Sequence, residues 1–212
     1  MSAFNLSSAF VTFFAVVGPP KVLLSFAHLA RDREPKELIR LAAVSSLVSA
    51  AVGVTMAFTA SPLASVFHIG HESLEIAGGV IFFTYAVALV LGIHLGGSED
   101  PEGHLSSPLA DGVRELLLPY VASPLAITAV LVESLEKDTF SWSTTIATAY
   151  LAVLIINFLC VLLLAPLLRR IQPTSLEVLW RLLGLLLAAL AVEQFLQGLQ
   201  ALGIPIETTP VR

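Results

Sequence analysis

The residues with the clearest potential for chemistry are prolines inside apolar blocks. Gly18-Pro19-Pro20 interrupts one block and Ser123-Pro124 interrupts another. Proline removes an amide donor and clashes with the carbonyl four residues back, so each segment predicts a broken helix. Gly or Ser followed by Pro also favours the start of a new helix. The freed carbonyls would suit an ammonium group or a cation, and the new helix N-termini a carboxylate. Together the two breaks predict a site for a zwitterion such as an amino acid.

The two breaks recur at a spacing that other residues share. Pro19 and Pro124 are 105 positions apart, Gly79 and Gly184 are also 105 apart, and Pro62 and Pro166 are 104 apart. We predict a first three-helix repeat in residues 1–97, a cytoplasmic linker loop in residues 98–115 and a second repeat in residues 116–212. Because three spans are an odd number, the second repeat would be inverted, as in many secondary transporters. The alternatives are a duplication kept for stability and ordinary proline kinks healed by neighbouring groups.

The elements that must position these breaks are membrane-spanning helices. Of the 212 residues, 56% are hydrophobic and 13% are charged, and the mean hydropathy is +0.87. A soluble domain carries about 25% charged residues. The apolar blocks also have the length of about 20 residues that a helix needs to cross a bilayer. We therefore predict an all-α membrane protein with spans near residues 6–30, 41–67, 74–95, 116–135, 143–168 and 179–202, the first and fourth broken near the midplane.

The orientation follows from the basic residues, which stay cytoplasmic when they lie in short loops. Eight of them lie on the side of the odd-numbered loops: Arg31, Arg33, Lys36, Arg40, Arg114, Arg169, Arg170 and Arg181. The opposite side has Lys137 and Arg212. This bias predicts a multi-pass protein of the cytoplasmic membrane with both termini external. The net charge of −5 offers no basic face for nucleic acid. The expected partners are the lipid bilayer and a small-molecule substrate, and the sequence leaves a homo-oligomer open.

Three polar residues at membrane depth are further site candidates. Asn157 lies near the middle of the fifth span, where it could contact substrate or simply join two helices. Lys21 and Glu193 are charges inside spans, each costing at least about 2.5–3.5 kcal/mol on insertion scales. Lys21 would bind a substrate carboxylate or replace a coupling cation, and Glu193 would be its counter-ion or a proton carrier. The alternative is that each side chain reaches its own membrane interface.

The function that these features predict is secondary transport of a small neutral amino acid or related metabolite. An ion or solute channel would need a continuous polar path, and a non-transporting scaffold would not need two broken helices. The histidines have no metal-ligand spacing, and the chain has neither a nucleotide-binding loop nor a protease motif. We therefore expect no enzymatic activity, no metal and no cofactor.

Several segments resemble the MarC family of integral membrane proteins, within the broader LysE-like exporter superfamily. They are residues 76–83 (IAGGVIFF), 122–128 (ASPLAIT), 181–189 (RLLGLLLAA) and 191–192 (AV). The resemblance implies six spans with external termini and proton-coupled transport of small neutral amino acids such as glycine and alanine. It adds Thr128, in the motif after the second break, to the candidate substrate-binding residues.

The sequence departs from the family pattern at both breaks. Where the family usually has Asp-Pro followed by a Gly-Asn pair, this chain has Gly18-Pro19-Pro20-Lys21-Val22. Where the family usually has Gly-Pro-Gly, this chain has Ser123-Pro124-Leu125. These departures leave the predicted fold unchanged and leave the identity of the substrate open.

Overall fold

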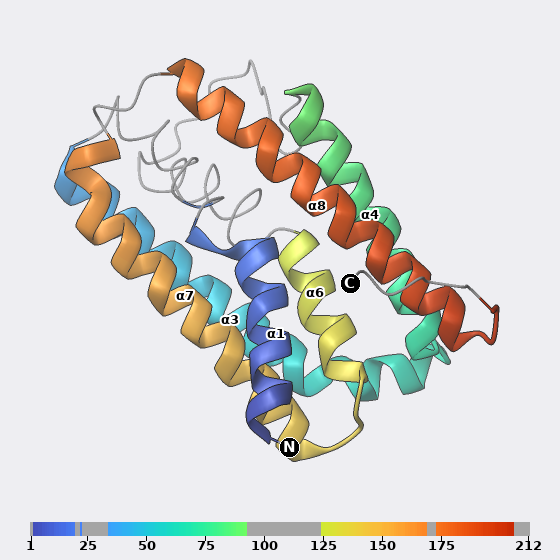
Figure 1. Cartoon of the computed structure of the whole chain (residues 1–212). Coiled ribbons are helices and arrows are strands. Elements are labelled where there is room, and N and C mark those ends of the chain that lie inside the picture. The colour runs from blue at the N-terminus through green and yellow to red at the C-terminus, as the bar shows by residue number, and fades with distance from the viewer. Residues whose placement is uncertain (1, 20–21, 23–33, 93–123, 169–172, 206–212) are drawn as a thin grey trace, which may run out of the picture.

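The protein is all-helical in the residues that its computed structural model describes, which are 2–19, 22, 34–92, 124–168 and 173–205. Figure 1 shows the six helices of these ranges: α1 (Ser2–Val17), α3 (Pro35–Phe67), α4 (His71–Leu91), α6 (Pro124–Leu135), α7 (Phe140–Leu168) and α8 (Pro173–Ala201). Four apolar stretches are long enough to cross a membrane: Lys36–Phe67, His71–Leu91, Phe140–Leu164 and Arg181–Ala201. The prediction of an all-α membrane protein is thereby confirmed. The linker 98–115 lies outside the described residues. So do residues 23–30 of the first predicted span and residues 116–123 of the fourth.

Two of the helix boundaries that differ from the predicted ones have local reasons. The helix α3 begins at Pro35 instead of residue 41, because extended Glu34 precedes a proline in the first turn. The helix α4 ends at Leu91 instead of residue 95. There Gly92 takes a left-handed conformation with φ 74°, and its N–H points to the carbonyls of Ala88 and Leu89.

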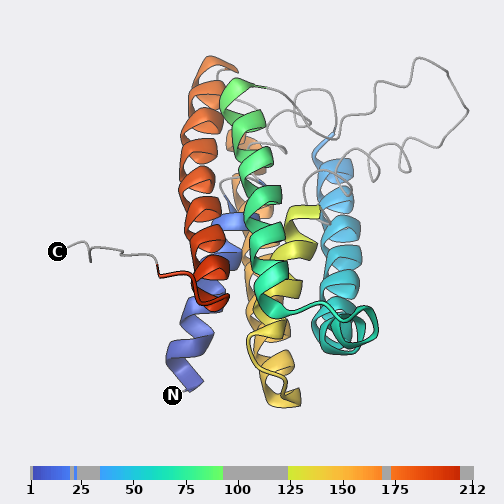
Figure 2. The same cartoon turned by 90° about the vertical axis from the view of Figure 1, so that its right-hand side faces the viewer.

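The helices pack as three antiparallel pairs, α1 with α6, α3 with α7 and α4 with α8 (Figures 1 and 2). The helix α1 also packs on α7, and α6 packs on α3. The pair α4 and α8 forms one side of the molecule and contacts the rest through α6 and α4. Between residues 182 and 192 the exposed side chains of α8 are all apolar, with Leu185 and Leu186 more than 60% exposed, as a surface against lipid requires.

The contact between α4 and α8 depends on two glycines. A Cβ atom on Gly79 would lie 2.9 Å from the carbonyl oxygen of Ala191. A Cβ atom on Gly184 would lie 3.0 Å from the carbonyl oxygen of Ala86. Small residues of this kind let helix backbones approach closely in membranes, where the apolar effect does not drive helix association.

The repeat spacing relates these two contacts to each other. Adding 105 to each residue number on α4 gives its counterpart on α8: Gly79 becomes Gly184, Ala86 becomes Ala191 and Val90 becomes Phe195. Gly79 approaches Ala191 and Phe195, while Gly184 approaches Ala86 and Val90. Each contact is thus the other with the roles of the two helices exchanged. Such reciprocity is typical of a two-fold interface.

We expect Gly79→Ala to lower the melting temperature of the detergent-solubilised protein by roughly 5 °C, since the added methyl would press on backbone that cannot move aside. Gly78→Ala is the matched control. Its Cβ would meet only side-chain atoms, at 3.1–3.3 Å, on Gln194, Thr128 and Val132. A thermal unfolding scan of both variants measures the difference. Equal melting temperatures would contradict close backbone packing at Gly79.

Candidate functional site

The helix α1 ends in the interior of the bundle. Its last residue is Val17, Gly18 forms a bend, and Pro19 and Val22 then take helical conformation, with the Val22 N–H pointing to the Gly18 carbonyl at 3.4 Å. In Figure 1, α1 ends about half-way along α7. The helix α6 is described from Pro124 onward, the residue expected to open a new helix.

Gly18 is required by the path of the chain at this bend. A Cβ atom on Gly18 would lie 1.8 Å from the carbonyl oxygen of Phe14, far inside van der Waals contact. Gly18 and Pro19 are both buried. The backbone at the end of α1 therefore follows a course that only glycine permits without rearrangement.

The carbonyl that ends α1 is bonded to a side chain from another helix. Asn157, on α7 and only 3% exposed, donates from Nδ2 to the carbonyl oxygen of Val17 at 2.8 Å. Because only the NH₂ end of the amide can donate, this bond fixes the orientation of the side chain. The other end, Oδ1, is a buried acceptor for which no donor is present among the described residues. An unsatisfied buried acceptor costs about 1–3 kcal/mol, so it calls for a ligand or a water molecule.

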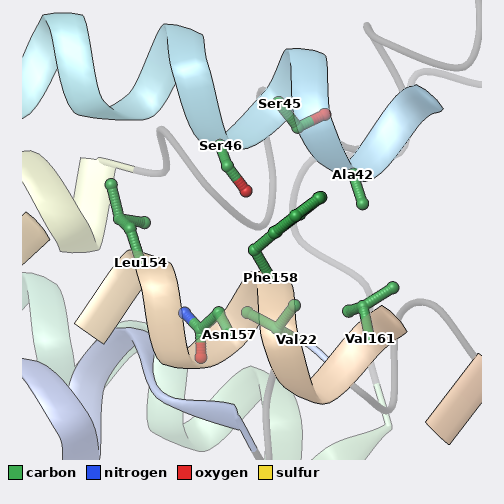
Figure 3. A pocket seen from close by; sticks show the side chains of 8 residues that line it. All are labelled: Val22, Ala42, Ser45, Ser46, Leu154, Asn157, Phe158 and Val161. Carbon is green, nitrogen blue, oxygen red and sulfur yellow. The ribbon is translucent and has the colours of Figure 1, made fainter. Parts of the chain in front are cut away.

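A small pocket, open on one side, adjoins Asn157 between α3 and α7 (Figure 3). Its described lining has three polar residues and five apolar ones, and no charge: Ser45, Ser46, Asn157, Val22, Ala42, Leu154, Phe158 and Val161. The hydroxyl of Ser46 points from α3 toward α7, on the side of Leu154 and Phe158. Ser45 Oγ is also buried, with no bonding partner in the described part of the chain. The asparagine amide thus lies between the end of α1 and a mostly apolar pocket.

The structure brings together some of the predicted site residues and not others. Thr128 is buried on α6, where its methyl group faces Gly78 of α4. Glu193 is exposed on α8, and its Oε1 accepts a hydrogen bond from Gln197 Nε2 at 3.4 Å. Lys21 and Ser123 lie outside the described residues, and so does any pairing of Lys21 with Glu193. Gly18, Pro19 and Asn157 are the candidates that meet at the end of α1.

Ser45 and Ser46 were not predicted as site residues. Both belong to a serine-rich part of the second span. The sequence favours a packing role for this part, because small residues are common where membrane helices contact each other. Nothing in the local sequence separates a serine that packs from one that lines a pocket.

The apolar helices define an integral membrane protein with a buried polar site at the end of α1. Residues 4–202 match the model of the MarC family integral membrane protein. The chain belongs to this family, as the sequence resemblance indicates.

Curated relatives match over nearly their whole lengths. The UPF0056 membrane protein YvbG of Bacillus subtilis is 27% identical, over 94% of this chain and 96% of the relative. A UPF0056 membrane protein of Methanocaldococcus jannaschii is 24% identical, over 91% and 94%. The UPF0056 inner membrane protein YhgN of Escherichia coli is 23% identical, over 92% and 96%. No solved structure matches the chain.

Proposed function

We propose that this protein is a secondary transporter that moves a small neutral amino acid, or a related small metabolite, across the cytoplasmic membrane with ion or proton coupling. The observation that carries the proposal is the amide of Asn157. It is fixed on the last carbonyl of α1 and leaves a buried acceptor free beside a helix end. A soluble ligand with an ammonium group would satisfy that acceptor.

The proposal includes two inverted three-helix repeats, with α1 and α6 as halves of helices broken near the midplane. Three observations support it. Each helix of the first half packs antiparallel to its counterpart in the second half. The contacts of Gly79 and Gly184 are reciprocal at the repeat spacing of 105. Helix α1 ends about half-way along α7. Irregular backbone at this depth is tolerated only where protein or a wet cavity surrounds it.

The chemistry of the site suits a zwitterion. Asn157 Oδ1 and the carbonyls at the end of α1 would accept hydrogen bonds from an ammonium group. The N-terminus of α6 and the Lys21 side chain would favour a carboxylate. Rocking of one repeat against the other would then expose the site to each side in turn. Glu193 is kept as the candidate coupling residue; it is exposed on α8 and accepts a hydrogen bond from Gln197.

Flux into proteoliposomes tests this function. Purified protein should take up labelled glycine or L-alanine with saturation, driven by an imposed proton or sodium gradient. The buried ligand site lies between helices, so uptake should be limited by a conformational cycle. Flux that grows linearly with concentration would favour the channel alternative. Flux equal to that of protein-free vesicles, for a panel of small amino acids, would favour a scaffold.

The orientation proposed for the chain makes a separate prediction. In a Cys160→Ser background, Lys137→Cys should react with a membrane-impermeant thiol reagent in intact cells, because the loop between α6 and α7 would be external. Arg33→Cys should react only after permeabilisation. The reverse pattern of labelling would invert the proposed topology.

A further inference from the structure

The helices α3 and α7 meet at two places that the internal repeat relates to each other. Adding 104 to a residue number on α3, the spacing of Pro62 and Pro166, gives its counterpart on α7. Ser46 then corresponds to Tyr150, and Gly53 corresponds to Asn157. At one meeting place Gly53 faces Tyr150, and at the other Ser46 and Asn157 line the same pocket.

The first meeting place is filled by an aromatic ring. A Cβ atom on Gly53 would lie only 2.1 Å from Tyr150 Cε1, so the ring lies directly against the glycine backbone. The Tyr150 ring also packs edge-on against Phe13 of α1, with the two ring centroids 5.5 Å apart. Tyr150 is 2% exposed.

The second meeting place has the opposite distribution of side chains. Ser46 stands where the first place has Tyr150, and Asn157 stands where it has Gly53. Asn157 turns its amide to the Val17 carbonyl on α1, so it does not fill the space toward α3 (Figure 3). The pocket therefore exists because position 46 carries a hydroxymethyl group where its counterpart carries a phenol ring.

We propose that Ser46 sets the size of the substrate that this protein accepts. The proposal rests on the transport function above. With the ammonium group of an amino acid held at Asn157, its side chain occupies the pocket between α3 and α7, against Ser46 and Phe158. The described lining is uncharged and mostly apolar, so the pocket takes a small neutral side chain and excludes an acidic or a long basic one.

Competition among amino acids of increasing size tests this role. Uptake of labelled glycine into proteoliposomes would be measured against unlabelled L-alanine, L-2-aminobutyrate and L-valine. Ser46→Val should narrow the pocket and raise the ratio of the alanine to the glycine inhibition constant about tenfold, since one methyl group in an apolar pocket changes selectivity by about 10-fold or more. Ser46→Gly should lower the ratio of the L-2-aminobutyrate to the glycine inhibition constant by a similar factor. Ala43→Val, on the exposed face of the same helix, is the matched control and should leave all ratios unchanged.

The outcomes separate the two proposals. Unchanged ratios in both Ser46 variants, or an equal loss for every amino acid, would overturn the role of Ser46 while transport stands. Absence of glycine or alanine uptake by the unmodified protein would overturn the transport function itself.

A stability measurement tests the relation between the two meeting places without transport. Ser46→Tyr should lower the melting temperature, because the ring would collide with the Cβ of Asn157, just as Tyr150 would collide with a Cβ on Gly53. The double variant Ser46→Tyr/Asn157→Gly copies the packing of Tyr150 on Gly53 and should recover most of that loss, a coupling typical of residues in contact. A double variant no more stable than Ser46→Tyr would contradict the equivalence on which the proposal depends.

Discussion

Replacing Asn157 by leucine should lower amino-acid uptake at least about tenfold while the protein still inserts, because it removes both the donor to Val17 and the acceptor that the substrate would use. Leucine shares the branched shape of asparagine, although it is larger, and it is favourable in hydrocarbon, so insertion should not suffer. The carbonyl of Val17, buried and without its donor, would leave the end of α1 free to adopt another conformation. The measurement is the initial rate of glycine and alanine uptake, normalised to the amount of reconstituted protein.

Ile155→Leu provides the control for this variant. Ile155 lies two residues away on α7 and is 58% exposed on the outer face, so its replacement by leucine should leave uptake and stability unchanged. If Asn157→Leu transported as fast as the unmodified protein, Asn157 would be only a packing residue and the site would have to be elsewhere.

Gly18→Ala should have an effect of similar size, for a reason of geometry instead of hydrogen bonding. The methyl group would have to sit 1.8 Å from the carbonyl oxygen of Phe14, so the bend at the end of α1 could not keep its present course. We expect uptake to fall at least about tenfold and the melting temperature to fall by several degrees, as for other substitutions that force backbone to shift. This clash also means that the larger Gly18→Leu change would alter folding together with transport, so alanine is the more informative substitution.

Gly70→Ala is the matched control, because its Cβ would also lie close to another atom. That atom is Glu72 Oε2, at 2.5 Å, the end of a flexible side chain that can turn away. Gly70→Ala should therefore keep nearly normal uptake and stability. Normal uptake by Gly18→Ala would show that transport does not need the bend in the form seen here, and would favour an ordinary proline kink.

The chain's own sequence determines the membrane class, the helices and the end of α1. Long apolar blocks must bury their backbone polar groups in helices when they lie in lipid, so their number and approximate limits can be read without a structure. The end of α1 is equally local. Two prolines at positions 19 and 20 remove amide donors whatever surrounds them, and α1 accordingly stops at Val17. The boundaries that differ, at Pro35 and Gly92, depend on single turns that apolar length does not resolve.

The tertiary structure decided which residues meet. Asn157 lies 140 positions from Val17, and no local signal distinguishes an asparagine that joins two helices from one that ends a broken helix. Likewise Ser45 and Ser46 line the pocket and Ser49 does not, although all three belong to the same serine-rich part of α3. In lipid, where the outer face of a helix is as apolar as its packed face, hydrophobicity does not indicate which side turns inward. That choice is made by close contacts such as Gly79 on Ala191, and it exists only once the helices are packed together.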